Sequence, residues 1–166
     1  MNDRTMTRLI GRTLMSGLLV GMCAAPAAAI APFKKVFFDV YVKPDSAEPN
    51  EKAFAAAAEA KATGECWVCH AKWKGADKHV RNSYGKALSS LLDKKNFGSE
   101  RREAEPDKCD KEIRDALEKV AGMKSNPADA SSPTFGELIK SGKLPSDGKP
   151  DAGDLEKAKA KAKDDE

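Results

Sequence analysis

The chain has 166 residues, of which 33% are charged and 6% are aromatic, and its formal net charge is +3. This length fits one small domain, and a charge so close to zero gives no case for nucleic-acid binding. A chain this polar and this poor in aromatic residues buries only a thin apolar core by itself.

The first 29 residues predict a signal peptide. Arg4, Arg8 and Arg12 precede a short apolar stretch over 14–22, and the alanines at 27–29 have the small-residue pattern of a cleavage site. The stretch is short for a membrane span and no stop-transfer pattern follows it, although an uncleaved anchor stays open. We therefore expect export to the periplasm or another extracytoplasmic space, with no integral span in the mature chain and a remaining charge of about +1.

Beyond the leader, helical spacing of apolar residues predicts an all-α domain over residues 30–145. Short helices with long loops between them are expected over 33–41 (where a strand is the alternative), 51–62 behind an Asn50 cap, 83–92, 106–123 and 135–141 behind a Thr134 cap. The helix over 83–92 is expected to bury one face that carries Tyr84, Ala87, Leu88, Leu91 and Leu92. On the apolar stripe of the helix over 106–123, Cys109 is expected to be a buried free thiol, with a mixed disulfide as the lesser option. Residues 146–166 predict a charged low-complexity tail that is either disordered and flexible or a solvated helix.

The segment Cys66-Trp67-Val68-Cys69-His70 carries the chemistry, because Cys-x-x-Cys-His is the attachment sequence for c-type haem. The two thiols add across the two vinyl groups of a haem, which lie a fixed distance apart. Cysteines three positions apart lie near one face of a helical turn and can reach both groups. His70 then presents its imidazole to the iron from the same side as a proximal ligand. The motif predicts one covalent haem c, attached through Cys66 and Cys69, with His70 bound to the metal.

Two other chemistries use a Cys-x-x-Cys pair, namely a redox disulfide and half of a structural zinc site. A zinc site normally needs four ligands, and beyond the motif the sequence offers only Cys23, Cys109 and His79. Cys23 lies within the leader. A thioredoxin-type redox site is expected among alternating strands and helices, a pattern that this sequence lacks. The sequence therefore favours haem over both alternatives.

The ligand on the opposite face of the iron decides the mechanism. Met123 is the only methionine after the leader, and it stands at the end of a predicted helix before a loop with two prolines. A methionine ligand raises the potential and suits electron transfer, and filling a core gap is the alternative role for Met123. His79 is the rival ligand, although it follows His70 closely and a solvated loop histidine is its alternative role. More distant candidates, which would need a deprotonated amine, are Lys72, Lys78 and Lys86.

Two further segments give residues 33–145 a family likeness. Together with the motif, Arg81-Asn82-Ser83-Tyr84-Gly85-Lys86-Ala87-Leu88 and the segment from Pro133 to Pro145 resemble small monohaem cytochrome c-like proteins of the bacterial cell envelope, of a sort seen in planctomycete-type genomes. The resemblance implies a cytochrome c-like haem domain that binds haem and transfers electrons, and it names no redox partner. The chain departs from class I cytochromes c because it lacks a clear final helix rich in aromatic residues.

The sequence therefore predicts an exported monohaem c-type cytochrome that carries single electrons and performs no substrate chemistry. Basic residues after the motif could surround an exposed haem edge and steer an acidic redox partner, although such a group is equally a solvated loop. They are Lys72, Lys74, Lys78 and Arg81. Two alternatives stay open: a five-coordinate haem protein that acts on or senses peroxide or a small gas, and a haem module of a larger envelope complex.

Overall fold

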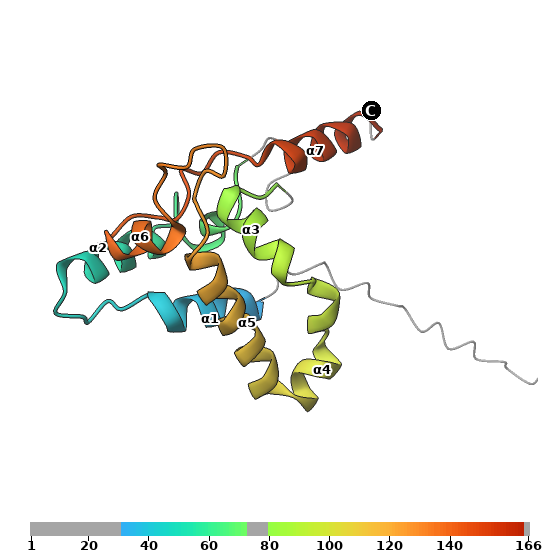
Figure 1. The fold of residues 1–166 in the computed structure, drawn as a ribbon. Coiled ribbons are helices and arrows are strands. Elements are labelled where there is room, and N and C mark those ends of the chain that lie inside the picture. Colours follow the sequence, from blue (N-terminus) through green and yellow to red (C-terminus); the bar gives the residue numbers. More distant parts are fainter. Residues whose placement is uncertain (1–30, 73–79, 165–166) are drawn as a thin grey trace, which may run out of the picture.

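The computed structural model describes residues 31–72 and 80–164, and within these ranges the fold is helical, with isolated bridges and no sheet. Figure 1 shows these elements in chain order: α1 (Ala31–Tyr41), α2 (Pro49–Glu59), the 3₁₀ turn η1 (Glu65–Val68), α3 (Ser83–Leu91), the 3₁₀ turn η2 (Lys94–Phe97), α4 (Ser99–Ala104), α5 (Pro106–Ala121), α6 (Phe135–Lys140) and α7 (Ala152–Asp164). The all-α class is confirmed for this part of the chain. The expected signal peptide over 1–29 and His79 lie outside the described residues.

The core lies where α1, α3 and α6 pack around α5, the longest helix of the described chain (Figure 1). The apolar stripe predicted for α5 is buried except at Ala121, which is partly buried. The buried members are Cys109, Ile113, Ala116, Leu117 and Val120. Across from it, the ring of Tyr84 in α3 meets Phe37 in α1 and Phe135 in α6 edge to face, with ring centroids 5.9 Å and 5.2 Å apart. These aromatic contacts join helices that are distant in sequence into one apolar core.

Local signals explain where the first two helices begin and end. Residues 33–41 form a helix, so the strand alternative is wrong. α2 begins at Pro49 rather than behind an Asn50 cap, because proline fits the first helical position and Glu48 takes the cap position. α2 also ends at Glu59 rather than Ala62, since the next residue is extended and a turn follows it.

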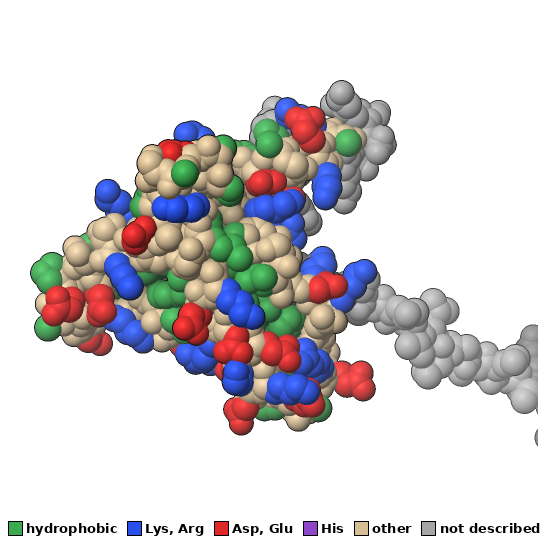
Figure 2. All heavy atoms as spheres, viewed as in Figure 1, with side chains coloured by type: hydrophobic (Ala, Val, Ile, Leu, Met, Phe, Trp, Pro, Cys, Tyr) green, Lys and Arg blue, Asp and Glu red, His purple; other side chains and the backbone are tan. Residues whose placement is uncertain are grey.

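The polar segment between α3 and α5 folds more fully than the sequence suggests. η2 buries Phe97, whose ring packs edge to face on Phe33 with centroids 5.0 Å apart. Arg101 of α4 binds both carboxylate oxygens of Glu112 on α5, at 2.6 Å and 3.1 Å. Figure 2 shows side chains of both charge signs interspersed over this end of the molecule. Leu91, expected on the buried face of α3, is instead 40% exposed at the end of that helix.

No helix in the described ranges is both long enough and apolar enough to cross a membrane.

Candidate functional site

The turn η1 brings the three residues of the predicted attachment site together. A 3₁₀ turn has about three residues per turn, so side chains three positions apart eclipse one another. Cys66 lies in this turn and Cys69 caps its end, so we expect their side chains on one face, and both thiols are free. The amides of Cys69 and His70 both donate to the carbonyl oxygen of Cys66, at 3.3 Å and 3.1 Å, which places His70 directly beyond the second thiol.

The surroundings of the second cysteine of the motif change the acidity of its thiol. Burial raises the pKa of the Cys69 thiol to about 12, and the neighbouring Cys66 adds to this rise. Within the described ranges, no group of three or more His, Cys, Asp or Glu side chains is arranged to hold a metal ion.

Asn82, which lies outside η1, forms hydrogen bonds with the backbone of the motif over 67–70, called here the attachment turn. Its side chain is fully buried, and its Nδ2 donates to the carbonyl oxygens of Trp67, Val68 and His70 at 3.1 Å, 3.0 Å and 3.4 Å. Its own backbone amide donates to the carbonyl oxygen of Cys69 at 3.2 Å. Four consecutive carbonyl groups of the motif therefore accept hydrogen bonds from one residue.

The same asparagine begins α3. Its Oδ1 accepts a hydrogen bond from the Gly85 amide at 2.9 Å, which is the usual way in which Asn caps a helix. The residue pattern predicts the start of this helix at Ser83 and no role for Asn82. Its position immediately before the helix was a signal for the cap, whereas its contacts with the motif depend on the three-dimensional fold.

Gly85 allows α3 to lie directly against the motif. A Cβ atom at this position would overlap the carbonyl oxygen of Cys69. We expect Gly85→Ala to lower the free energy of unfolding by about 2–4 kcal/mol, because the motif backbone would have to move. Urea denaturation followed by circular dichroism measures the change. Gly122→Ala is the matched control, since its Cβ would make only ordinary contact at 3.5 Å. Equal stability of the two variants would contradict the close approach of α3.

The residues flanking the motif tie it to the chain that follows. His70 and Arg81 form an antiparallel bridge, and the Ala71 amide donates to the carbonyl oxygen of Val80 at 3.0 Å. Trp67 is partly exposed, and the ammonium group of Lys72 lies 5.2 Å from the centroid of its ring. The side of the motif that carries Trp67 therefore reaches the surface next to a positive charge.

The hydroxyl group of Tyr84 is buried and has no hydrogen-bond partner among the described residues. Burial raises its pKa well above the ordinary value for tyrosine, and the nearby Cys69 and Tyr41 side chains add to the rise. A buried polar group left without a partner costs about 1–3 kcal/mol. A bound group that brought a polar atom to this place beside Cys69 would therefore be stabilised.

Met123 lies just beyond the end of α5 and is partly buried. It packs against the same core cluster that Cys69 contacts. Its backbone amide donates to the Val120 carbonyl at 2.9 Å, and its carbonyl oxygen accepts from the Phe135 amide at 3.0 Å. The contact with the core cluster fits the core-packing role of Met123, and iron ligation stays a prediction. The rival ligand His79 lies outside the described residues.

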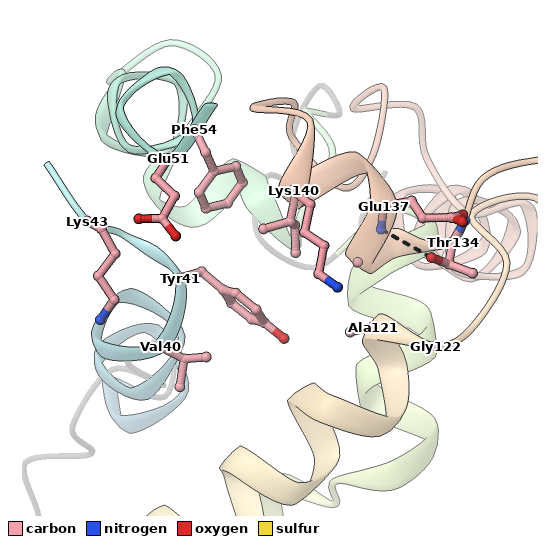
Figure 3. A pocket seen from close by; sticks show the side chains of 12 residues that line it. Val40, Tyr41, Lys43, Glu51, Phe54, Ala121, Gly122, Thr134, Glu137 and Lys140 are labelled. Carbon is pink, nitrogen blue, oxygen red and sulfur yellow. Dashed lines mark hydrogen bonds between the residues drawn. The ribbon is translucent and has the colours of Figure 1, made fainter. Parts of the chain in front are cut away.

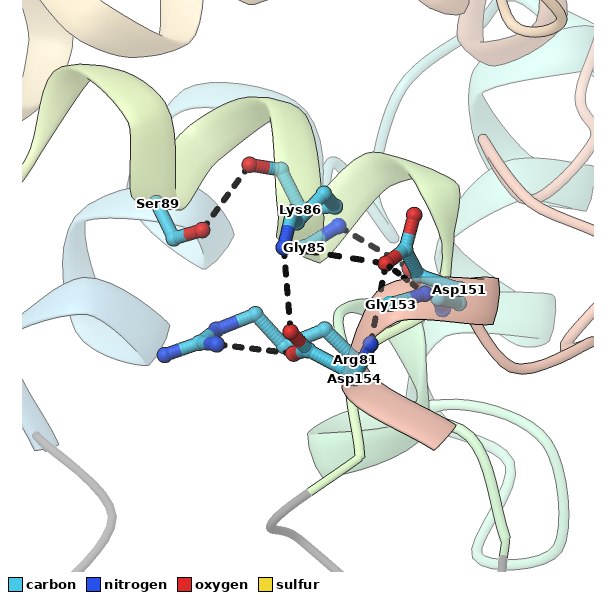
Figure 4. Close-up of polar contacts among 8 residues, drawn as sticks. Arg81, Gly85, Lys86, Ser89, Asp151, Gly153 and Asp154 are labelled. Atoms are coloured by element: carbon cyan, nitrogen blue, oxygen red, sulfur yellow. Dashed lines mark hydrogen bonds and ion pairs between the residues drawn. The ribbon is translucent and has the colours of Figure 1, made fainter. Parts of the chain in front are cut away.

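The C-terminal tail is anchored beside the motif. Asp154 of α7 is 5% exposed, and its carboxylate binds Arg81 at 2.8 Å and Lys86 at 3.1 Å (Figure 4). The Asp151 amide also donates to the Arg81 carbonyl oxygen at 2.7 Å. Of the two states predicted for the tail, the helix is found over Ala152–Asp164 rather than a flexible segment. It is not wholly solvated, because one of its acidic residues is buried in an ion pair. The charge of Arg81 is therefore partly neutralised, and this residue would attract an acidic redox partner less strongly than the sequence suggests.

Protonation of Asp154 should release α7 in acid. Burial raises the pKa of this carboxyl group, but hydrogen bonds from Lys86 and Arg81, together with their charges, outweigh burial and hold the pKa below the ordinary 3.8. A lowered folded-state pKa means that the stabilisation is present above pH 3.8 and is lost as the pH falls through the folded value. At neutral pH, Asp154→Asn should destabilise the docked α7 by about 1–2 kcal/mol, allowing for the partial exposure of both cations.

Hydrogen exchange of the α7 amides measures this docking. Exchange should be faster in Asp154→Asn than in the wild type at neutral pH, and the two proteins should converge in acid. Glu156→Gln is the matched control, because Glu156 is exposed and, among the residues that the structure describes, forms its ion pair with Lys159 on the same helix. Unchanged exchange in Asp154→Asn would show that the ion pair does not hold α7.

A cavity of about 480 Å³ lies elsewhere, between α1, α2, α5 and α6 (Figure 3). Its apolar wall includes Tyr41 and Phe54, and charged side chains such as Lys43 and Lys140 stand around it. The volume is in the range of small-molecule sites. The three motif residues do not line this cavity, so it is not part of the attachment site.

Comparison of the chain with protein-family models, with curated proteins and with solved structures finds no match in any of the three. The candidate site therefore rests on the motif and on the contacts described above.

Proposed function

We propose that this chain is an exported c-type cytochrome that carries single electrons through one haem bound covalently at Cys66 and Cys69. The observation that carries the proposal is the pair of free thiols three positions apart, one in η1 and one directly after it, followed by His70. Two thiols with this spacing and a following histidine are what haem attachment requires. Export, proposed from residues 1–29, agrees with this chemistry because c-type haem is attached outside the cytoplasm.

The residues around the turn fit such a group. Cys69 packs against an apolar cluster that includes Val68, Tyr84 and Leu88, and a large apolar cofactor would extend this thin core. The unpartnered Tyr84 hydroxyl beside Cys69 offers a hydrogen bond to a polar atom of a bound group. These features support a cytochrome c-like haem domain in a chain whose own apolar core is small.

Each side chain has a distinct part in the proposal. Cys66 and Cys69 anchor the cofactor, His70 is the proximal ligand, and Met123 is the proposed distal ligand. A bound haem would supply an iron that alternates between two oxidation states, so no substrate chemistry is needed. The apolar residues of the core keep water away from this centre, which tunes its potential.

The proposed partner is a redox protein that docks near the motif. Lys72 lies beside the partly exposed Trp67 and makes no ion pair with the described carboxylates, so its charge is available to an acidic surface. Arg81 contributes less because Asp154 binds it. Lys74 and Lys78 lie outside the described residues.

Spectroscopy of the matured protein tests the function. The full chain is expressed with a cytochrome c maturation system, loose haem is removed under denaturing conditions, and oxidised and reduced spectra are recorded. A retained c-type spectrum with the weak far-red band of methionine ligation is the expected result. Retained haem that binds carbon monoxide or cyanide rapidly at neutral pH would favour the five-coordinate alternative. No covalent haem, under conditions that mature a control cytochrome, would overturn the proposal and leave a dithiol.

A further inference from the structure

A single 3₁₀ turn cannot hold the two thiols in place by itself. Short helical turns are unstable alone, because few backbone hydrogen bonds offset the conformational entropy that is lost. The carbonyl groups of the last residues of a helical turn accept no hydrogen bond from within the turn, so N–H donors elsewhere in the protein must bind them. In η1 these are the carbonyls of Trp67 and Val68, and Asn82 donates to both.

Asn82 combines three roles that are usually divided among several residues. Its Nδ2 reaches three motif carbonyls, its backbone amide binds the Cys69 carbonyl, and its Oδ1 caps α3 through the Gly85 amide. Complete burial removes water as a competing partner for these bonds. The orientation of the attachment turn relative to α3 therefore depends on one side chain.

We infer that Asn82 is a positioning residue that preforms the attachment turn, so that Cys66 and Cys69 are presented together to one ligand with two thiol-reactive positions. The inference rests on the proposed function for the identity of that ligand. The presentation of the thiols, however, is a property of the haem-free chain and can be measured without haem.

The variant Asn82→Asp removes the hydrogen bonds that Asn82 donates to the motif and keeps the cap of α3. Asp has nearly the same shape and is as good a cap as Asn, so the acceptor for the Gly85 amide is kept. The donor Nδ2 becomes an oxygen that faces the carbonyl oxygens of Trp67 and Val68, so the attraction turns into repulsion. Asn96→Asp is the matched control, because it makes the same charge change at an exposed position.

Binding of phenylarsine oxide to the haem-free chain reads out thiol alignment. This reagent loses its oxygen as water when it forms two arsenic–sulfur bonds, so it binds tightly where two thiols are presented together. The assay is made in a Cys23→Ser/Cys109→Ser background, which leaves Cys66 and Cys69 as the only cysteines of the chain. We expect Asn82→Asp to weaken binding about tenfold, equivalent to ~1.4 kcal/mol, and Asn96→Asp to leave it unchanged. Wild-type affinity in Asn82→Asp would overturn the inference.

If circular dichroism shows that Asn82→Asp does not fold, Asn82→Ser decides the question by the same assay. Serine keeps a capping oxygen and adds no charge, but it is too short to reach the three motif carbonyls. Weakened binding in a folded Asn82→Ser protein supports the positioning role, and unchanged binding overturns it.

Attachment itself gives a second readout. After maturation, mass spectrometry and the pyridine haemochrome spectrum distinguish chains attached through one thiol from those attached through two. Loss of the positioning contact should raise the singly attached share, whereas a merely structural role would lower the total yield and leave that share unchanged. If wild-type chain takes no covalent haem, the proposed function fails, while the arsenical assay still decides the role of Asn82.

Discussion

The double variant Cys66→Ser/Cys69→Ser is expected to retain no haem after denaturing extraction, whereas Cys109→Ser retains the wild-type amount. Serine has nearly the shape of cysteine but does not form the thioether bonds. Cys109 is a free thiol buried on the α5 stripe, as expected from the sequence, and lies on a different element from the motif. Mass spectrometry of the denatured chain, with or without the added mass of one haem, measures the result. Haem retained by the double variant would contradict attachment at the motif.

The single variants should separate the two anchors. Cys66→Ser and Cys69→Ser should each keep a fraction of singly attached chain, because one thioether and the His70 ligand remain. Cys69→Ser should lose more stability than Cys66→Ser. Its side chain is partly buried and packs against the core cluster, so a hydroxyl there costs about 1–3 kcal/mol if it is left unpartnered. Comparison of the two urea midpoints tests this asymmetry.

The parts of the fold that could be predicted are those determined by residues close to one another in the sequence. The buried stripe of α5 follows from helical spacing alone. The start of α6 follows from a capping box, in which the Thr134 amide donates to Glu137 at 2.6 Å and the Glu137 amide donates to the Thr134 hydroxyl at 3.1 Å. Both signals act within a few residues, so the chain around them does not change their meaning.

The parts that could not be predicted depend on contacts between distant segments. Arg81 and Asp154 are 73 positions apart in the sequence. Asp154 stands in a tail rich in lysine and alanine, and no pattern in the neighbouring residues predicts that its side chain is buried. Asn82 contacts the motif only because the chain returns after residue 72 and pairs His70 with Arg81. The spacing of the two cysteines predicts the attachment chemistry, but the polar contacts that hold the turn come from tertiary structure.

These contacts suggest how a chain with a thin core holds its candidate site. Asn82 binds the motif backbone. Arg81, the residue directly before Asn82, forms an ion pair with Asp154 on α7. Buried hydrogen bonds and a shielded ion pair thus act where a larger protein would use apolar packing. We therefore expect the order of the motif to depend more on these polar residues than on substitutions in the distant α4.

Met123→Leu should lower the reduction potential of the matured protein by on the order of 0.2 V, within the roughly 0.8 V range that axial ligands span. Leucine has nearly the volume of methionine, so the cost in folding stability should stay below about 1.5 kcal/mol. The far-red absorption band should disappear, and carbon monoxide should bind the reduced protein rapidly. Redox titration and absorption spectroscopy measure these changes together.

Leu144→Met is the matched control, because Leu144 packs against the same core cluster and the swap also conserves volume. It should leave both the band and the potential unchanged. If Met123→Leu also leaves them unchanged, Met123 fills a core gap and His79 becomes the candidate ligand. In that case His79→Ala should shift the reduction potential although Met123→Leu does not. The identity of the axial ligand sets the potential of the iron, so only the loss of the actual distal ligand changes it.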